Sequence, residues 1–419
     1  SLNITFKYAN AVYFGVDTLN MRMNAGNISL DDLREVVSLC HDHGIRSYLT
    51  TNVIIYENER EYIKNILERA YSAGIDAVIV HDFSVIQYAK ELGIPFHIST
   101  QMNISNSDAA RYMEKIGAER IILARELSLQ QIREITNKLE YVGIELFIHG
   151  AMCTSISGRC YLSQEINKDQ TKKKGIDVSA NRGQCLQPCR SKWDVILKHP
   201  NGTEIEYSDC YFLNSKDLCM IENLPALLST GAIAFKVEGR NRNVSYLDVV
   251  GQCYREALDS YYEGDYTQDK IDSWKNKLSS VYNRGFSTGF YFSQPDVGDI
   301  IRNQTGNLST HTRVQIGEVI SYFRKVQVAK IRLFAGQLKV GEEILIEGSS
   351  KGTFHRQILK NLRIQQKEVI QTPFISSEKA ISENDCSITV SFRVDSPVSS
   401  GDKVYMFIKR NLNYQNQKE

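Results

Sequence analysis

The chain has 419 residues, 42% of them hydrophobic and 24% charged, with a formal net charge of +1. These proportions exclude a disordered polyelectrolyte and are typical of a globular protein with room for two or more domains. A charge near zero does not require nucleic acid as a partner, although a local basic patch could still bind it. Nine cysteines, no apolar run of about 18 residues and no secretory leader make the cytoplasm the expected compartment.

Residues 11–240 alternate short apolar runs with amphipathic stretches, several of which end at a glycine. Such alternation predicts parallel β/α units. The first choice of fold is therefore an α/β (β/α)8 TIM-like barrel, with a doubly wound open sheet as the alternative. Only seven strands are predicted, so we expect the first barrel strand to be missing. The predicted strands are 11–15, 47–51, 77–80, 96–99, 120–123, 145–148 and 232–237, and the main helices are 30–43, 57–73, 84–92, 108–116 and 128–139.

Polar side chains follow most of the predicted strands. In a TIM-like barrel, the carboxyl ends of the strands carry the active site. Each of these residues alone could be a helix cap or a loop residue, but together they predict a pocket. The catalytic candidates are His81, Asp82, His149 and Glu238, and the substrate-binding candidates are Asn52, Gln101, Arg125, Lys236 and Arg240.

Four cysteines lie within 37 residues, as Cys153-x6-Cys160 and Cys185-x3-Cys189. Two close pairs of thiols can complete a tetrahedral site for Zn²⁺ or hold an iron–sulfur cluster, and the spacing does not choose between them. Disulfides are disfavoured because they are typical of small secreted domains. Cys153 closely follows a predicted strand, so we expect the cysteines to form an insertion, over about 150–193, on the same face as the pocket.

Three lysines, Lys172, Lys173 and Lys174, lie between the two cysteine pairs in a polar stretch without periodicity. This stretch is either a solvated loop or a contact for RNA phosphates. The predicted domains are residues 1–265 for the barrel with its cysteine insertion, 266–310 for a helical and glycine-rich linker, and 311–415 for a small β-barrel. The last assignment follows from short alternating strands and from a likeness of LKVGEEILIEG to translation-factor barrels.

The stretch ELFIHGAMCTSISGRCYLS, beginning at Glu145, resembles the signature of peptidase family U32, the collagenase-like proteases. The resemblance covers most of residues 10–300, and it includes QCLQPCR, FLNSKDL, FKVEGR and YNRGFSTGF. It implies a 4Fe–4S cluster held by the four cysteines. It also implies an RNA hydroxylase, since better-understood members hydroxylate RNA bases or a quinone ring. The most similar members imply a tRNA-modifying enzyme that converts wobble uridine to 5-hydroxyuridine, with prephenate as a required metabolite.

Prephenate carries two carboxylates, and bidentate capture by Arg125 and Arg240 would suit them. Two other functions remain open. A peptidase could use Cys153 or Cys160 with His149, although the chain has no HExxH or GxSxG motif and the four-cysteine spacing would be unexplained. A zinc-stapled, non-catalytic binding or assembly protein is the other alternative, and the many polar strand ends disfavour it.

Overall fold

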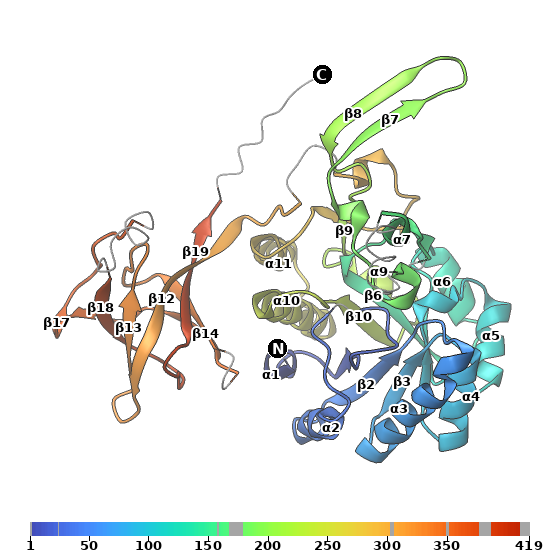
Figure 1. The fold of residues 1–419 in the computed structure, drawn as a ribbon, viewed down its shortest axis with the longest axis horizontal. Coiled ribbons are helices and arrows are strands. Elements are labelled where there is room, and N and C mark those ends of the chain that lie inside the picture. Colours follow the sequence, from blue (N-terminus) through green and yellow to red (C-terminus); the bar gives the residue numbers. More distant parts are fainter. Residues whose placement is uncertain are drawn as a thin grey trace. The chain divides into compact units, whose positions relative to one another are not determined.

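The computed structural model describes residues 2–23, 25–156, 159–166, 179–301, 306–348, 352–376 and 387–410. The chain divides into two units, the first running to Leu308 and the second beginning at Ser309. Figure 1 colours the first unit from blue to light orange and the second in deeper orange and red. None of the helices described here is both long and apolar enough to cross a lipid bilayer.

The first unit is organised around seven parallel strands. They correspond to the seven predicted runs, which confirms the parallel α/β character of this part of the chain. Each strand hydrogen-bonds to the next in sequence order. The strands are β1 (Ala11–Phe14), β2 (Arg46–Thr51), β3 (Ala77–Val80), β4 (Phe96–Ile98), β5 (Arg120–Ile122), β6 (Gly143–Ala151) and β10 (Ala234–Glu238).

This consecutive order rules out the doubly wound alternative, because a doubly wound sheet reverses its strand order at a switch point. The strand pairs of the described residues do not, however, close the sheet into the predicted eight-stranded barrel. Side chains instead link its first and last parallel strands. The Tyr13 hydroxyl of β1 donates to the Val237 carbonyl of β10 at 3.1 Å, and the Lys236 ammonium lies 3.9 Å from the Tyr13 ring centroid.

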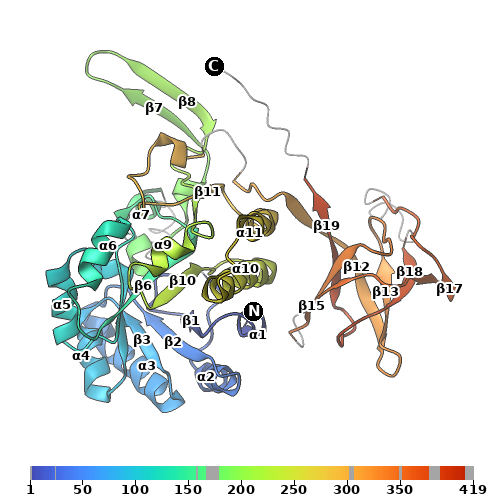
Figure 2. The same cartoon turned by 180° about the vertical axis from the view of Figure 1, so that it is seen from behind.

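Amphipathic helices connect the parallel strands and pack on their outer side in both views (Figures 1 and 2). Their apolar faces supply much of the buried core, for example Ile63, Ile66 and Leu67 of α3. Gly74 and Gly93 end α3 and α4 in the left-handed conformation that glycine adopts without strain. The connecting helices are α2 (Leu33–Asp42), α3 (Arg60–Ala73), α4 (Phe83–Leu92), α5 (Ser107–Lys115) and α6 (Leu129–Thr136).

A second group of elements follows β6. Figure 1 shows β7 (Trp193–Lys198) and β8 (Glu204–Cys210) as a hairpin that projects from the first unit, and the sequence did not predict it. Strand β9 (Asp217–Cys219) pairs antiparallel with the end of β6, and β11 (Phe286–Ser287) pairs with β9. The helices of this group are α7 (Leu162–Ile166), α9 (Leu224–Leu228), α10 (Val244–Glu263) and α11 (Gln268–Ser280), and a further short helix, α1 (Leu2–Thr5), precedes β1.

Residues 266–308 belong to the first unit rather than forming the expected linker. Helix α11 buries Trp274 and Leu278 in the core of this unit. The glycine-punctuated segment after it is fixed by a buried ion pair, in which Arg284 Nη2 lies 2.6 Å from Asp217 Oδ1. This pair gives the YNRGFSTGF block a structural role, because it ties β11 to β9.

The second unit is an antiparallel β-structure, as its alternating sequence predicts. Its eight strands pair in the order β15-β14-β19-β12-β13-β18-β16-β17, and their inner faces bury an apolar core that includes Ile316, Ile331 and Phe392. The pairs do not join β15 to β17, so within the described residues the sheet is not closed into the predicted barrel. The strands are β12 (His311–Phe323), β13 (Val328–Leu333), β14 (Glu343–Glu347), β15 (Phe354–Ile358), β16 (Arg363–Ile364), β17 (Lys367–Glu368), β18 (Ile388–Arg393) and β19 (Lys403–Lys409).

Candidate active site

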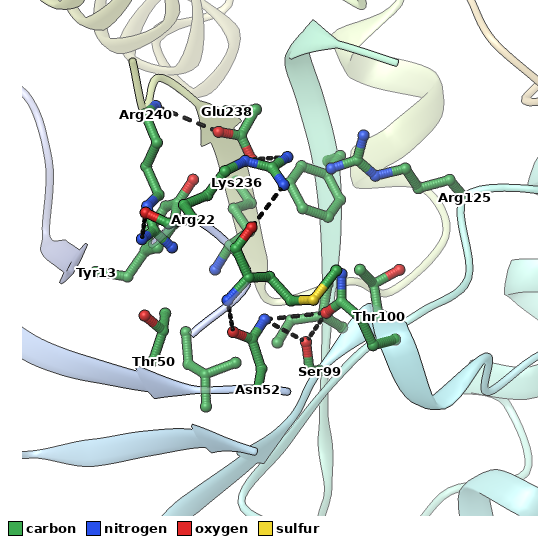
Figure 3. Close-up of a pocket in the computed structure, with 15 residues that line it drawn as sticks. Tyr13, Arg22, Thr50, Asn52, Ser99, Thr100, Arg125, Lys236, Glu238 and Arg240 are labelled. Atoms are coloured by element: carbon green, nitrogen blue, oxygen red, sulfur yellow. Dashed lines mark hydrogen bonds and ion pairs between the residues drawn. The ribbon is translucent and has the colours of Figure 1, made fainter. Parts of the chain in front are cut away.

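A pocket lies at the carboxyl ends of the parallel strands of the first unit (Figure 3). It contains about 430 Å³ of space free of atoms, including the part that is open to solvent. Six of the nine catalytic and substrate-binding candidates line it, namely Asn52, Gln101, Arg125, Lys236, Glu238 and Arg240. The remaining lining residues are Tyr13, Met21, Arg22, Thr50, Ile79, Ser99, Thr100, Ile122 and Phe147.

The other three candidates lie elsewhere. The Asp82 carboxylate caps α4 by accepting from the Ser84 N–H at 2.9 Å, and it also accepts from the Ile55 N–H at 3.2 Å. His81 is partly buried, and its pKa is lowered mainly by that burial. Neither residue lines the pocket, which fits helix capping and loop packing better than catalysis.

His149 is 2% exposed and packs among Tyr254, Tyr246 and Phe286. Its Nδ1 lies 3.3 Å from the Tyr254 hydroxyl. Burial lowers the pKa of His149 to about 4, so the imidazole is neutral at pH 7. His149 does not line the pocket, because its side chain points into an aromatic cluster between β6 and α10.

Glu238 is the acidic centre of the pocket, and the charges of three arginines act on it. Arg22 Nη2 lies 3.7 Å from Glu238 Oε2, and the backbone N–H of Arg240 donates to Glu238 Oε1 at 3.2 Å. Burial opposes ionisation of Glu238, but Arg22, Arg125 and Arg240 outweigh burial and lower its pKa. The four side chains carry three positive charges and one negative charge, so the pocket suits an anionic ligand.

The arginines are held in place by contacts of their own. The Arg125 guanidinium donates to the Ala151 carbonyl at 2.8 Å and stacks 3.7 Å from the Phe147 ring centroid. Arg240 donates to Asn27 Oδ1 at 3.1 Å and to the buried Asn20 side chain. Burial lowers the pKa of Arg240 to about 10, which leaves it charged at pH 7.

Lys236 enters the pocket beside a second buried carboxylate. Its ammonium lies 2.8 Å from Glu145 Oε1, and Arg120 Nη1 lies 2.9 Å from Glu145 Oε2. Burial alone would raise the pKa of the Glu145 carboxyl group. The two cations outweigh burial and lower this pKa to about 2. Lys236 is therefore already engaged by Glu145 and by the Tyr13 ring, which leaves the arginines as the groups better placed to bind an incoming anion.

The cysteine segment, defined as residues 150–193, docks on the loops that follow β1 and β2. The Met23 N–H donates to the Gly183 carbonyl at 3.0 Å, and the Arg182 guanidinium contacts Glu59, the Ile54 carbonyl and the Tyr56 ring. Gly183 has φ of +80°, and a Cβ atom there would lie 1.9 Å from the Asn20 carbonyl oxygen. Only glycine fits at this contact.

The four thiols that were predicted as metal ligands are free and lie partly exposed on the cysteine segment. The Leu162 N–H donates to Cys160 Sγ at 3.4 Å, and the Gln187 N–H donates to Cys185 Sγ at 3.3 Å. The pKa of the Cys189 thiol is raised, mainly by burial. The thiols of Cys153 and Cys185 also raise this pKa, and Arg190 opposes them. Arg125 of the pocket donates to the carbonyl of Ala151, two residues before Cys153, so this end of the cysteine segment lies beside the pocket.

These thiols fit a soft metal or an iron–sulfur cluster by their chemistry, because backbone N–H donors to sulfur favour the thiolate form that ligates metal. They are not gathered into a closed site. Among the residues that the structure describes, no three His, Cys, Asp or Glu side chains form a metal-binding group. Lys172, Lys173 and Lys174 lie outside the described residues.

Sequence reasoning missed Arg22 and Tyr13. Tyr13 lies on β1 itself, and Arg22 lies in the long loop from β1 to α2. That loop is fixed by the fully buried Asn20, whose Nδ2 donates to the Val16 carbonyl at 2.6 Å. The polar run Asn20-Met21-Arg22-Met23 after an apolar strand was the available signal.

A family model for peptidase family U32 matches residues 3–300, which is most of the first unit and includes every residue of the pocket. The chain belongs to peptidase family U32. A relative from Methanocaldococcus jannaschii, named as an uncharacterized protease, is 42% identical over 86% of this chain and 87% of its own length.

Two further relatives carry different functional names. One from Porphyromonas gingivalis, named a collagenase, is 35% identical over 96% of this chain and 94% of its own length. One from Bacillus subtilis, named tRNA hydroxylation protein P1, is 29% identical over 85% of this chain and 83% of its own length. Relatives named tRNA hydroxylation protein are 27% to 32% identical, and one from Escherichia coli named 23S rRNA 5-hydroxycytidine C2501 synthase is 38% identical over 70% of this chain. These names support an enzyme and a hydroxylase-type role within the family.

Proposed function

We propose that the protein is a cytoplasmic RNA hydroxylase that converts wobble uridine of tRNA to 5-hydroxyuridine. The reaction inserts one oxygen atom into the C5–H bond of the base, a two-electron oxidation in which a separate oxygen donor is the co-substrate. The observation that carries the proposal is the pocket of Arg22, Arg125 and Arg240 around Glu238, close to the thiols of the cysteine segment. The relatives named tRNA hydroxylation protein favour the same function.

The charges of the pocket support prephenate as the required metabolite. Three guanidinium groups and one ionised carboxylate leave two positive charges, and prephenate carries two carboxylates. Arg125 and Arg240 offer planar N–H groups that match a carboxylate in a bidentate arrangement. Glu238 separates their charges, and it would repel a carboxylate placed against it, so it restricts the orientations that the metabolite can adopt.

The thiols of Cys153, Cys160, Cys185 and Cys189 would hold a 4Fe–4S cluster. Bound there, the cluster supplies one-electron transfer. The chain's own part is to present thiolates, supported by the backbone N–H groups of Leu162 and Gln187, on a segment fixed to the β1–α2 loop by Gly183. Zinc at the same thiols is the alternative, and metal analysis separates the two.

RNA would approach the pocket as a single strand, because a base must leave its stack before C5 can enter a protein pocket. The anticodon loop presents the wobble base in this form. Lys172, Lys173 and Lys174 are proposed to contact its phosphates.

The test is to express the chain in a host that lacks its own 5-hydroxyuridine enzymes and to measure tRNA nucleosides by mass spectrometry. We expect 5-hydroxyuridine with the wild-type protein, and none with Cys189→Ala or in a host that makes no prephenate. Formation in the prephenate-free host would remove that metabolite from the proposal. Absence of 5-hydroxyuridine with an iron-loaded wild-type protein would reject the tRNA assignment.

The second candidate is a peptidase, which the names of the Porphyromonas gingivalis and Methanocaldococcus jannaschii relatives favour. Its proposed nucleophile pair is not supported, because His149 is buried against Tyr254 and no contact among the described residues joins it to Cys153 or Cys160. Gelatin cleavage that disappears in both Cys160→Ala and His149→Ala, with folding intact, would restore this candidate.

A further inference from the structure

The pocket wall formed by Asn52, Ser99 and Gln101 has a hydrogen-bond polarity that the backbone fixes. The Met21 N–H can only donate, and it donates to Asn52 Oδ1 at 3.2 Å. The nitrogen of the Asn52 amide must therefore lie on the other side. There it donates to Ser99 Oγ and to Gln101 Oε1, both at 3.0 Å.

The same chain of bonds orients the amide of Gln101. Its Oε1 accepts from Asn52 Nδ2 and from the Ser99 hydroxyl. Gln101 Nε2 consequently points away from both, and no described residue is recorded as its acceptor. Asn52 and Ser99 are buried, whereas Gln101 is half-buried and lines the pocket. The wall thus offers an N–H₂ donor to whatever occupies the pocket.

We propose that Gln101 Nε2 donates to O4 of a uracil base and so selects uridine over cytidine. This inference rests on the proposed function, since it assigns the target base to the same pocket. Uracil presents an acceptor at O4 and a donor at N3–H, whereas cytosine presents a donor amino group and an acceptor at N3. The acceptor at uracil O4 matches the donor that Gln101 offers in the pocket.

Cytosine would bring its amino group against the amide nitrogen of Gln101, with two donors facing each other. A site built to hydrogen-bond one partner rejects the other because buried polar groups are left unpaired. Asn52 is a positioning residue here: its amide is used in holding Met21, Ser99 and Gln101, and it acts on the base through Gln101.

Two substitutions reverse the polarity by different routes. Asn52→Asp keeps the acceptor for the Met21 N–H but removes the donor, so the Gln101 amide turns its nitrogen to the new carboxylate and its oxygen to the pocket. Gln101→Glu still accepts from Asn52 and presents a carboxylate oxygen to the pocket. Gln101→Leu removes the donor without adding an acceptor. Asn106→Asp is the matched control, because Asn106 caps α5 outside the pocket and Asp serves equally well there.

The measurement is calorimetric titration of each protein with uridine 5′-monophosphate and with cytidine 5′-monophosphate, which share one phosphate charge. We expect the wild type and Asn106→Asp to prefer the uridine nucleotide about tenfold. We expect Gln101→Leu to show no preference, and both Asn52→Asp and Gln101→Glu to lose or reverse it. General damage to the fold would weaken the binding of both nucleotides and leave the ratio of the two affinities unchanged.

Failure to bind either nucleotide, equal affinities in the wild type, or an unchanged ratio in both polarity variants would overturn the inference. The proposed function fails separately. If the wild type forms 5-hydroxyuridine in tRNA but shows no nucleotide preference, the role of Gln101 is wrong and the function stands. If the preference exists and no hydroxylated base forms, Gln101 keeps its role and the reaction is a different one.

Discussion

The pocket and the cysteine segment are built in opposite ways. Every charged group named in the pocket already has a protein partner: Glu238 has Arg22, and Lys236 has Glu145. The four thiols of the cysteine segment lie partly exposed and, within the described residues, form no metal-binding group. Parallel strands and the loops that follow them carry the pocket, whereas short helical turns and loops carry the thiols.

This difference separates two sources of order. Buried ion pairs and hydrogen bonds hold the pocket in place before any ligand arrives, and such preorganisation makes binding less costly. Thiol ligands are gathered by the metal itself, so the free energy of metal binding also orders the segment that carries them. We therefore expect changes in the two regions to be separable, with iron content reporting on one and fold stability on the other.

The largest expected effect is on iron. Cys185→Ser should remove nearly all bound iron and the visible absorption of the anaerobically purified protein, because a hydroxyl is a poor replacement for a thiolate at an iron–sulfur cluster. Binding of uridine 5′-monophosphate at the pocket should change less than about threefold, because ion pairs that do not include the thiols hold the pocket residues in place.

Cys40→Ala is the control for this experiment. Cys40 is fully buried in α2, and burial raises the pKa of its thiol to about 11, so it is a core residue rather than a ligand. Equal iron content in wild type, Cys185→Ser and Cys40→Ala would show that the four-cysteine segment holds no cluster. One zinc per chain in place of iron would favour the zinc-stapled alternative.

The second largest expected effect is on the stability of the fold, through a buried carboxylate beside the pocket. Glu145→Gln leaves the partly buried cations Lys236 and Arg120 without their shared carboxylate, and we expect a loss of about 3 kcal/mol in the free energy of unfolding at pH 7. The folded pKa of Glu145 is about 2, below its ordinary 4.5. Its stabilisation is therefore complete above pH 4.5 and is lost as the pH falls toward 2. The free energy of unfolding, measured with denaturant between pH 2 and 7, should depend less on pH in Glu145→Gln than in the wild type.

Glu222→Gln is the matched control, because Glu222 forms an ion pair of the same length, 2.8 Å, with Lys275 but is half exposed. Exposed pairs contribute only up to about 1 kcal/mol. Equal losses in the two variants would mean that burial of Glu145 does not set the strength of its interactions. Iron content should remain unchanged in both.

Much of the fold could be predicted from local patterns. Apolar runs separated by amphipathic stretches identified all seven parallel strands, and glycines such as Gly74 and Gly93 marked helix ends. Six pocket residues were found because the carboxyl ends of parallel strands meet on one face, so their positions follow from topology alone. The role of Gly183 needed the structure, because its neighbour Asn20 is far away in the chain.

The residues that lie outside the pocket have a common feature. In the sequence, Asp82 and His149 follow apolar runs as closely as Asn52 does, but Asp82 turns back to cap α4 and His149 turns into an aromatic cluster. Local polarity does not reveal these directions. Arg22 was missed because its loop takes its shape from Asn20, Arg240 and Gly183, three residues that lie apart in sequence.

The smallest expected effect tests the contact between the cysteine segment and the pocket side of the molecule. In Gly183→Ala, the new Cβ would meet the Asn20 carbonyl at 1.9 Å, so the cysteine segment must shift away from the β1–α2 loop. Gly202→Ala is matched in backbone conformation, with φ of +87° against +80°, but has no atom within 4 Å of the added carbon. The control therefore carries the conformational strain alone, about 1 kcal/mol.

We expect Gly183→Ala to lose about 1 kcal/mol more than Gly202→Ala in denaturant unfolding and to bind less iron, because the clash adds to the strain. Equal losses would mean that the contact between Gly183 and Asn20 contributes nothing to stability. Loss of iron without a further loss of stability would be the most informative result. It would show that the pocket side of the molecule positions the thiols while remaining folded without them, which is the relationship that their opposite construction predicts.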